Sequence, residues 1–359
     1  MGMDRMKRIK SIDRLKNMMS NVDLQGLLLL NPSNIFFATG FMCEGSALII
    51  ADEITLIVPE MEEEHANESI DLDIDLDILV FKKKEEYWDK IKERLKDASK
   101  IGIEEDFISV KNFEKLKNLL EGRIIEVSED IQNLRMIKDR REIKNIKNAC
   151  KLADSGMNYV KEMISHGKRE RTVAVELEYW LKKEGAEGFA FDTIVVSGRN
   201  ASIPHKVSGN RKIRRGEPII VDFGPIWRGY CADLTRTFFI EESLDVYEIC
   251  LMAQEEVIKT IKEGIKACEV DKIARSIISE HGYEKNFIHS TGHGIGIDVH
   301  EKPRLSGEDD TMLKENMVVT VEPGIYVPKK FGVRIEDVVL VKKNRCVTLT
   351  KSEKVPIIF

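Results

Sequence analysis

The chain has 359 residues, enough for two or three domains that each bury a core of their own. Its 56 basic and 62 acidic side chains give a net charge of -6, so no bulk positive field attracts nucleic acid or an anionic membrane surface. Charged residues make up 33% and hydrophobic residues 42%, as in a soluble globular protein. We therefore expect neither nucleic acid nor membrane as a partner.

The N-terminal segment and the cysteines indicate the compartment. MGMDRMKRIKSIDRLKNMM is charged throughout and lacks the apolar core of a signal peptide, and no apolar run reaches the roughly 18 residues of a transmembrane helix. The six cysteines lie at least 18 positions apart, with no CxxC pair and no histidine at zinc-finger spacing. We expect a cytoplasmic protein with reduced thiols, which are Cys43, Cys150, Cys231, Cys250, Cys268 and Cys346.

The first part of the chain alternates short apolar runs with helix-like stretches. The runs predicted as strands are Leu27 to Leu30, Ala47 to Ile50, Ile54 to Val58 and Ile78 to Phe81. The stretches predicted as helices are residues 5–20, 84–97 and 110–120. This alternation predicts a small α/β domain over residues 1–130, and it contains no catalytic motif.

Residues 131–359 are predicted to form a second domain of different character. Apolar residues at steps of three or four predict a helix over 140–165 that Gly167 ends, and a second helix over 172–184 begins at Thr172 as N-cap and ends at Gly185. Apolar runs then predict strands over 192–196, 218–223 and 234–240.

The same order of elements then recurs, with helices predicted over 243–263 and 270–280. Gly264 lies 97 residues after Gly167, and Gly282 lies 97 residues after Gly185. VDFG at 221–224 and VEPG at 321–324 match at an offset of 100, and Asp233 matches Glu336 at 103. An internal duplication places equivalent strand ends face to face across a pseudo-twofold axis, so acidic residues from the two halves can meet.

Four carboxylates stand on apolar strands: Asp222, Asp233, Glu322 and Glu336. Burying them without compensation costs several kcal/mol each, and a pair of divalent ions about 3.5 to 4 Å apart supplies the missing charge. His293, within HSTGHGIG, offers one nitrogen ligand. Oxygen-rich coordination with a single imidazole favours manganese, iron(II) or cobalt and also admits zinc.

These segments resemble the pita-bread metallopeptidase family, M24, which includes methionine aminopeptidase, aminopeptidase P and prolidase. The resemblance covers the chain from about residue 135 and implies an α+β, creatinase/aminopeptidase-like catalytic domain. It also implies two divalent metal ions per subunit. The five residues at the family's metal-ligand positions are Asp222, Asp233, His293, Glu322 and Glu336.

The leading segment LLLLNPSNIFFATGF resembles the creatinase-like N-terminal domain that precedes the catalytic domain in prolidase, aminopeptidase P and creatinase. Methionine aminopeptidases generally lack this domain. The resemblance therefore favours an enzyme that acts on Xaa-Pro bonds, and it implies a homodimer.

The family mechanism implies roles for individual residues. A hydroxide shared by the two metals attacks the scissile carbonyl, and Glu322 passes its proton to the proline nitrogen. His205 and His300 match histidines that contact the carbonyl and the tetrahedral intermediate. His289 matches another site histidine, which contacts substrate or only supports its neighbours. Arg304 suits the free carboxylate of a dipeptide, with a solvated loop arginine as the alternative.

Three further residues are candidates for orienting the ligands. Thr235 matches a residue that steadies the metal site, while Tyr326 is a candidate partner of Glu322 and Arg334 of Glu336; strand packing is an equal alternative for each. The expected activity is hydrolysis of Xaa-Pro dipeptides, with short proline-containing peptides as partners. The alternatives are an aminopeptidase P that cuts longer Xaa-Pro peptides and a non-catalytic peptide-binding scaffold of the same fold.

Overall fold

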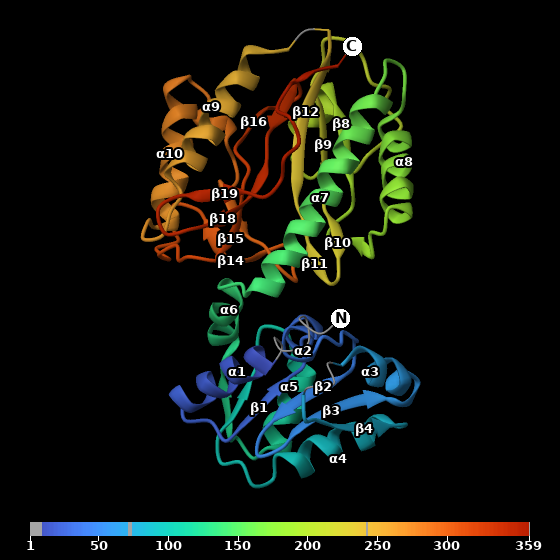
Figure 1. Cartoon of the computed structure of the whole chain (residues 1–359), viewed down its shortest axis with the longest axis vertical. Helices are drawn as coiled ribbons and strands as arrows, with labels where there is room; N and C mark the ends of the chain where they lie inside the picture. Colours follow the sequence, from blue (N-terminus) through green and yellow to red (C-terminus); the bar gives the residue numbers. More distant parts are fainter. Residues whose placement is uncertain (1–8, 71–73, 242, 359) are drawn as a thin grey trace. The chain divides into compact units, whose positions relative to one another are not determined.

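The computed structural model describes residues 9–70, 74–241 and 243–358 (Figure 1). The first residues of the helix expected over 5–20 lie outside this part of the chain. Two compact units divide the chain, Met1–Arg135 and Met136–Phe359.

The first unit is built on one six-stranded mixed sheet. Its strands are β1 (Gly26–Leu29), β2 (Ala47–Ile50), β3 (Ile54–Pro59), β4 (Asp77–Phe81), β5 (Ile101–Ile103) and β6 (Ile124–Glu126). Their order is β4-β3-β2-β1-β5-β6, with β1 antiparallel to β2 and parallel to β5. The four apolar runs in the sequence form the first four strands, so that prediction is confirmed, whereas the three-residue strands β5 and β6 were not predicted.

The first unit also contains helices. They are α1 (Ile9–Asn21), α2 (Pro32–Thr39), α3 (Glu63–Ser69), α4 (Lys84–Arg94), α5 (Val110–Leu119) and α6 (Ser128–Met136), with a 3₁₀ turn η2 (Glu60–Glu62). The predictions for α1, α4 and α5 are confirmed. The sequence prediction missed α2, although its start carries a clear signal: Asn31 Oδ1 accepts from Ser33 N at 2.9 Å, and Pro32 stands at the first helical position.

The second unit contains two pairs of helices. They are α7 (Arg140–Met163) and α8 (Glu170–Lys183), then α9 (Asp245–Thr260) and α10 (Ala267–Glu280). The last residues of α7 and α9, Met163 and Thr260, lie 97 positions apart, and so do Lys183 and Glu280 at the ends of α8 and α10. The predicted repeat of helix pairs is therefore confirmed in the same register.

The start of α8 differs from the prediction. The helix begins at Glu170, and its N-cap is Arg169, three residues before the expected cap Thr172; no side chain caps it. The main chain explains the difference, because Glu170 N and Arg171 N donate to the carbonyls of Arg211 and Gly209 at 3.0 and 2.9 Å. A neighbouring segment thus takes the place of a capping side chain.

The two longer sheets of this unit are mostly antiparallel. The first has the order β20-β12-β9-β8 and the second β14-β13-β15-β18-β19. Their strands are β8 (Ile194–Ser197), β9 (Ile219–Phe223), β12 (Leu234–Ile240), β13 (Gly292–Gly294), β14 (Glu301–Leu305), β15 (Val318–Val321), β18 (Asp337–Val341), β19 (Cys346–Thr348) and β20 (Ile357–Ile358), of which β20 runs parallel to β12. The strands predicted over 192–196, 218–223 and 234–240 are confirmed as β8, β9 and β12.

Shorter strands complete the second unit. They are β7 (Gly188–Phe189), β10 (Pro225–Trp227), β11 (Tyr230–Cys231), β16 (Gly324–Val327) and β17 (Phe331–Arg334), with the 3₁₀ turns η3 (Gly198–Ser202) and η4 (Glu284–Asn286). Figure 1 shows α7 running across the strands β9 to β11 with α8 beside it, and α9 and α10 at the opposite edge of the unit. The strands that contain or adjoin the predicted ligands thus come from both halves of the unit.

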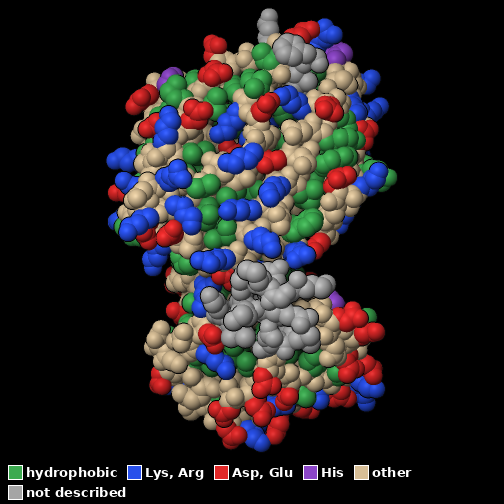
Figure 2. All heavy atoms as spheres, in the orientation of Figure 1, with side chains coloured by type: hydrophobic (Ala, Val, Ile, Leu, Met, Phe, Trp, Pro, Cys, Tyr) green, Lys and Arg blue, Asp and Glu red, His purple; other side chains and the backbone are tan. Residues whose placement is uncertain are grey.

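Binding to a membrane or a polyanion depends on the distribution of charged side chains and on the hydropathy of the helices. On the face that Figure 2 shows, Lys and Arg side chains of the second unit are scattered among acidic and hydrophobic ones. Among the helices of the described residues, none is both long enough and apolar enough to span a bilayer.

Candidate metal centre

The five predicted ligands lie in or beside strands of both halves of the second unit. Asp222 is in β9, Asp233 immediately precedes β12 and His293 is in β13. Glu322 immediately follows β15, and Glu336 immediately precedes β18. Asp222, Asp233, His293 and Glu336 are buried, and Glu322 is half-buried.

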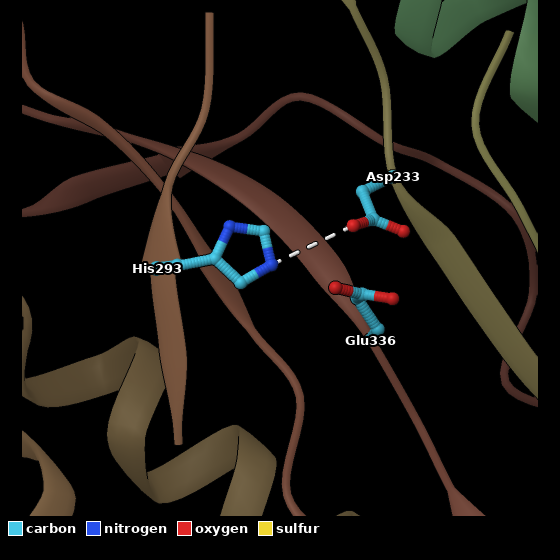
Figure 3. Close-up of side chains that lie close together, drawn as sticks. All are labelled: Asp233, His293 and Glu336. Atoms are coloured by element: carbon cyan, nitrogen blue, oxygen red, sulfur yellow. Dashed lines mark ion pairs between the residues drawn. The ribbon is translucent and has the colours of Figure 1, made fainter. Parts of the chain in front are cut away.

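Three of these residues converge most closely. Asp233, His293 and Glu336 each present a ligand atom within 4.8 Å of the other two, and Figure 3 shows them pointing toward one another from separate strands. His293 Nε2 lies 3.6 Å from Asp233 Oδ2 and 3.3 Å from Glu322 Oε1. Asp222 is not part of the tight trio, but its charge helps to raise the pKa of Asp233.

The ring of His293 is oriented for ligation. Its Nδ1 lies 3.0 Å from the carbonyl oxygen of Gly294, so a proton on Nδ1 donates to that carbonyl and Nε2 keeps its lone pair. Burial, followed by the nearby His300, lowers the pKa of His293 to about 4. The imidazole is therefore neutral at pH 7 and can bind a cation through Nε2.

The carboxylates repel one another in a site of low polarity. Burial and the charges of Asp222 and Glu322 raise the pKa of Asp233. Burial and the charge of Asp233 raise the pKa of Glu336 well above its ordinary range. Burial raises the pKa of Glu322 to about 7, against the opposing charge of Arg334. Without cations, the protein holds these groups partly protonated.

Unpartnered oxygen atoms show what the cluster lacks. Within the described part of the chain, Asp222 Oδ1, Asp233 Oδ1 and Glu336 Oε1 are buried and have no hydrogen-bond partner. A buried carboxylate oxygen without a partner is costly, and a cation satisfies several at once. The donor set of four carboxylates and one neutral imidazole therefore fits divalent metal ions of the harder first-row type.

Two residues orient the carboxylates from the sides. Thr235 Oγ1 donates to Glu336 Oε2 at 2.8 Å and accepts from Arg334 Nε at 3.2 Å. Arg334 Nη2 donates to Asp222 Oδ2 in a buried ion pair. The candidate role of Thr235 thus has a direct contact behind it, whereas the ion pair of Arg334 is with Asp222 and not with the expected Glu336.

Tyr326 also has partners other than the expected one. Its hydroxyl accepts from Arg334 Nη1 at 2.7 Å and lies 3.0 Å from His289 Nε2, so Arg334 and His289 take the place of Glu322. A Cβ on Gly324 would lie 2.5 Å from the Tyr326 hydroxyl, and Gly324 pairs with Arg334 across the β16–β17 hairpin. Because Gly324 has no side chain, the phenol of Tyr326 has room to contact Arg334.

His289 belongs to this chain of contacts. Burial, followed by the charge of Arg334, lowers its pKa to about 3, so the ring is neutral beside Tyr326. Of the two alternatives for His289, its contacts in the structure favour support of the site through Tyr326 and Arg334.

The predicted substrate residues lie around the centre. The ring of His300 meets that of His293 edge-on, with 4.4 Å between their centroids. Burial lowers the pKa of His300, and the charges of His205 and Arg304 lower it further, which places both residues within electrostatic reach. Arg304 is exposed and stands opposite His293 in the pairing of β13 with β14, and His205 is exposed in the loop after η3.

Two glycines allow β13 to approach its neighbours. A Cβ on Gly292 would lie 2.0 Å from the carbonyl oxygen of Thr320, and one on Gly294 would lie 2.2 Å from that of Lys302. Both distances are far below van der Waals contact. His293 can therefore stand where it does only because both of its neighbours lack a side chain.

Sequence reasoning missed two supporting residues. Thr320 Oγ1 accepts from His293 N at 3.1 Å. Asp271, buried in α10, accepts from Thr291 N and Thr291 Oγ1 at 3.1 and 2.8 Å and so holds the chain just before β13. A buried threonine two residues before Glu322 was a weak signal, but Asp271 lies on a polar-looking helix and has none.

The chain matches two known protein families. Residues 144–343 match metallopeptidase family M24, and residues 11–137 match the creatinase/prolidase N-terminal domain. The N-terminal-domain match covers most of the first unit, and the M24 match covers the part of the second unit that holds the five clustered residues.

Individual relatives are similar along nearly the whole chain. It is 41% identical over 351 residues to the Xaa-Pro dipeptidase of Pyrococcus furiosus, which covers 96% of this chain and 98% of that protein. The solved structure of an Xaa-Pro dipeptidase from Bacillus anthracis is 33% identical, with a TM-score of 0.92 over 98% of this chain and 100% of that one. An X-Pro aminopeptidase from Thermotoga maritima is 34% identical, with a TM-score of 0.88 over 96% and 99%.

Proposed function

The chain belongs to metallopeptidase family M24, and from this premise we propose that it is an Xaa-Pro dipeptidase that uses two divalent metal ions. The observation that carries the proposal is the convergence of Asp233, His293 and Glu336, with Glu322 3.3 Å from His293 Nε2 and Asp222 nearby. Dipeptidase relatives that align with 96% of this chain support the choice of substrate.

The five clustered residues would hold the metal ions. Bound there, the ions supply Lewis acidity and lower the pKa of a water molecule. Manganese, cobalt and iron(II) suit the oxygen-rich set best, and zinc is compatible with it. Arg334 and Thr235 keep Asp222 and Glu336 pointing inward through their hydrogen bonds, so little motion is needed when the ions bind.

We assign proton transfer to Glu322. Its side chain is 16% exposed against 7% for Asp233, so it is the more accessible of these two carboxylates. The nitrogen of an Xaa-Pro amide carries no hydrogen and must gain a proton to leave. In the proposed reaction Glu322 takes a proton from water and delivers it to this nitrogen.

The histidines act on the carbonyl of the scissile bond. His300 is neutral at pH 7 because its pKa is lowered, and a neutral imidazole can donate one hydrogen bond to an oxygen. Together with His205, it would stabilise the charge that develops on the carbonyl oxygen, an effect of about 3 kcal/mol per donor. The contact of His289 with Tyr326 supports a role in holding that residue.

Arg304 supports a dipeptide as the substrate. Its strand position opposite His293 puts a guanidinium beside the centre, where it can bind the free carboxylate of a C-terminal proline with two parallel hydrogen bonds. The second candidate is an aminopeptidase P, which the likeness to the Thermotoga maritima X-Pro aminopeptidase favours. In that case Arg304 would meet the continuing peptide instead of a carboxylate.

A peptide-length series decides between these functions. The protein is stripped with a chelator, reloaded separately with manganese, cobalt, iron(II) or zinc, and assayed with Leu-Pro, Met-Pro, Leu-Pro-Gly and the proline-free control Leu-Ala. We expect metal-dependent release of proline from Leu-Pro and Met-Pro, with slower cleavage of the tripeptide and of Leu-Ala. Faster cleavage of Leu-Pro-Gly would establish the aminopeptidase. A protein that binds no metal under any condition would be a peptide-binding scaffold.

We also infer a cytoplasmic homodimer. Among the described residues no cysteine forms a disulfide, and reduced thiols are typical of a reducing compartment. The dimer rests on the resemblance to prolidases. Light scattering at micromolar concentration tests it, and a mass near 41.1 kDa would exclude it.

A further inference from the structure

A second polar layer lies behind the metal centre. Successive residues of a strand point to opposite faces, so Asp337 points away from the centre that its neighbour Glu336 faces. Asp337 is 1% exposed, and its partners come from separate segments. From α9, Gln254 Nε2 donates to Asp337 Oδ2 at 2.9 Å and to the carbonyl of Val321, next to Glu322, at 3.3 Å.

Arg236 links the two halves of the site. Its Nη2 forms an ion pair with Asp337 Oδ1 at 2.7 Å, and both side chains are 1% exposed. Its Nη1 donates to the carbonyl of Thr235 at 2.9 Å and to the carbonyl of the ligand Glu336 at 2.5 Å. One guanidinium therefore joins β12, which begins directly after Asp233, to the main chain of Glu336.

Residues 350–356, which we call the C-terminal strap, complete this layer. Thr350 Oγ1 donates to Asp337 Oδ1 at 2.7 Å, and Lys354 Nζ lies 2.9 Å from Asp337 Oδ2. Asp337 thus has two cationic partners, one from β12 and one from the strap.

The strap also satisfies Arg236. The carbonyls of Ser352 and Glu353 accept from Arg236 Nη2 and Nε at 2.7 and 3.2 Å. The main chain of the strap is also held, since Lys351 N and Ser352 N each donate to Asp154 Oδ1 at 2.7 Å and Pro356 O accepts from Phe239 N at 2.7 Å.

We propose that the C-terminal strap is a positioning element of the metal centre, which fixes the spacing of Asp233 and Glu336 through Lys354, Asp337 and Arg236. The inference rests on the proposed metal centre. A guanidinium buried without all of its acceptors would draw in water or shift toward new ones. Because Arg236 holds the carbonyl of Glu336, such a shift moves a ligand although no strap residue touches the metal.

Metal binding and a cobalt spectrum test the role of the strap. Lys354→Met removes the ammonium and keeps most of the stem, and Thr350→Val removes one hydroxyl at nearly constant volume. We expect each variant to raise the cobalt dissociation constant, on the order of tenfold for Lys354→Met. The visible absorption of the bound cobalt should change as well, because it reports ligand geometry. Lys354→Arg keeps the positive charge, so its cobalt dissociation constant and visible absorption should both match those of the parent.

The control is Lys351→Met, which removes an exposed lysine of the same segment. A purely structural strap would lower the melting temperatures of metal-free and metal-loaded protein equally, whereas a positioning strap also reduces the gain in melting temperature on adding cobalt. Parent-like cobalt affinity and spectra in both Lys354→Met and Thr350→Val would overturn the inference. A parent protein that binds no cobalt would instead refute the proposed function.

Discussion

Lys138 Nζ lies 2.8 Å from Glu301 Oε2, in an ion pair whose side chains are 1% and 6% exposed. The other oxygen of Glu301 accepts from Ile297 N and Asp298 N at 2.9 and 3.1 Å, so the pair also fixes the turn that leads to His300. Removing one partner leaves the other charge buried.

We therefore expect Lys138→Met to lower the free energy of unfolding by about 3 kcal/mol, as measured by urea denaturation. The control is Arg215→Met, which breaks the exposed pair of Arg215 with Glu241, where the side chains are 62% and 55% exposed. That variant should lose less than about 1 kcal/mol. Equal losses in the two variants would contradict a special role of the buried pair.

The effect of Asp233→Asn should change sign with the metal. Without metal, the variant removes a buried carboxylate whose pKa is raised by burial and by neighbouring charges, so it should be more stable than the parent by about 1 kcal/mol. With metal, it lacks a ligand and should lose most of the stabilisation that the parent gains. Thermal melts with and without cobalt measure both effects. A metal-free variant less stable than the metal-free parent would show that Asp233 is not strained.

The metal-free protein should become more stable as pH falls from about 8 to about 6.5. Folding raises the pKa values of Glu322, Asp233 and Glu336. Between about pH 6.5 and about pH 8 the folded state therefore binds more protons than the unfolded state. The free energy of unfolding should rise by about 1 kcal/mol or more.

Below a pH of about 6.5 the trend should weaken, because His289 and His293 have folded pKa values lowered to about 3 and 4 and oppose it. Urea denaturation across the pH range, in a chelating buffer, measures the slope. Metal-loaded protein serves as the comparison and should lose the rise at acidic pH. A metal-free protein that is most stable at about pH 8 would contradict the raised carboxylate pKa values.

Arg304→Met should act on dipeptides more than on tripeptides. If the guanidinium binds the carboxylate of proline, its loss should raise KM for Leu-Pro about tenfold or more and leave kcat within a few-fold. Leu-Pro-Gly should be affected much less. Lys329→Met, which removes another exposed cation of the same unit, is the control. Equal increases in KM for both peptides would favour the view of Arg304 as a general surface charge.

The sequence predicted the internal repeat and its register because helix ends leave local marks. Gly167, Gly185, Gly264 and Gly282 all have positive φ, and their spacing is readable without a structure. Gly185 and Gly282 directly follow the C-caps of α8 and α10, whereas Gly167 and Gly264 lie four residues beyond the last residues of α7 and α9. The short strands β5 and β6 carry no such mark, since a strand of three residues is too short to show a period. The start of α8 could not be predicted from local sequence, because its first N–H groups donate to carbonyls in residues 209–211, which are distant in sequence.

For the site, the cluster of acids was predictable because four acids stand in or beside apolar strands, where an acid needs an explanation. Their supporting contacts were less accessible. Arg334 lies two residues before Glu336 yet binds Asp222, which is 112 positions away. A side chain of that length can reach several strands, and only the positions of those strands determine its partner. The same applies to Arg236, which looks like an ordinary charged residue of a strand and is among the largest fully buried side chains.

The tight packing of β13 against β14 and β15 affects the interpretation of mutational scans, in which each residue is substituted in turn. Any side chain at Gly292 or Gly294 would meet the main chain of β15 or β14 at about 2 Å, so both positions should be as intolerant as His293 between them. A screen that records only activity would then count two glycines among the chemically essential residues. Measuring the yield of folded protein alongside activity separates the two kinds of defect, since only the glycine variants should fail to accumulate.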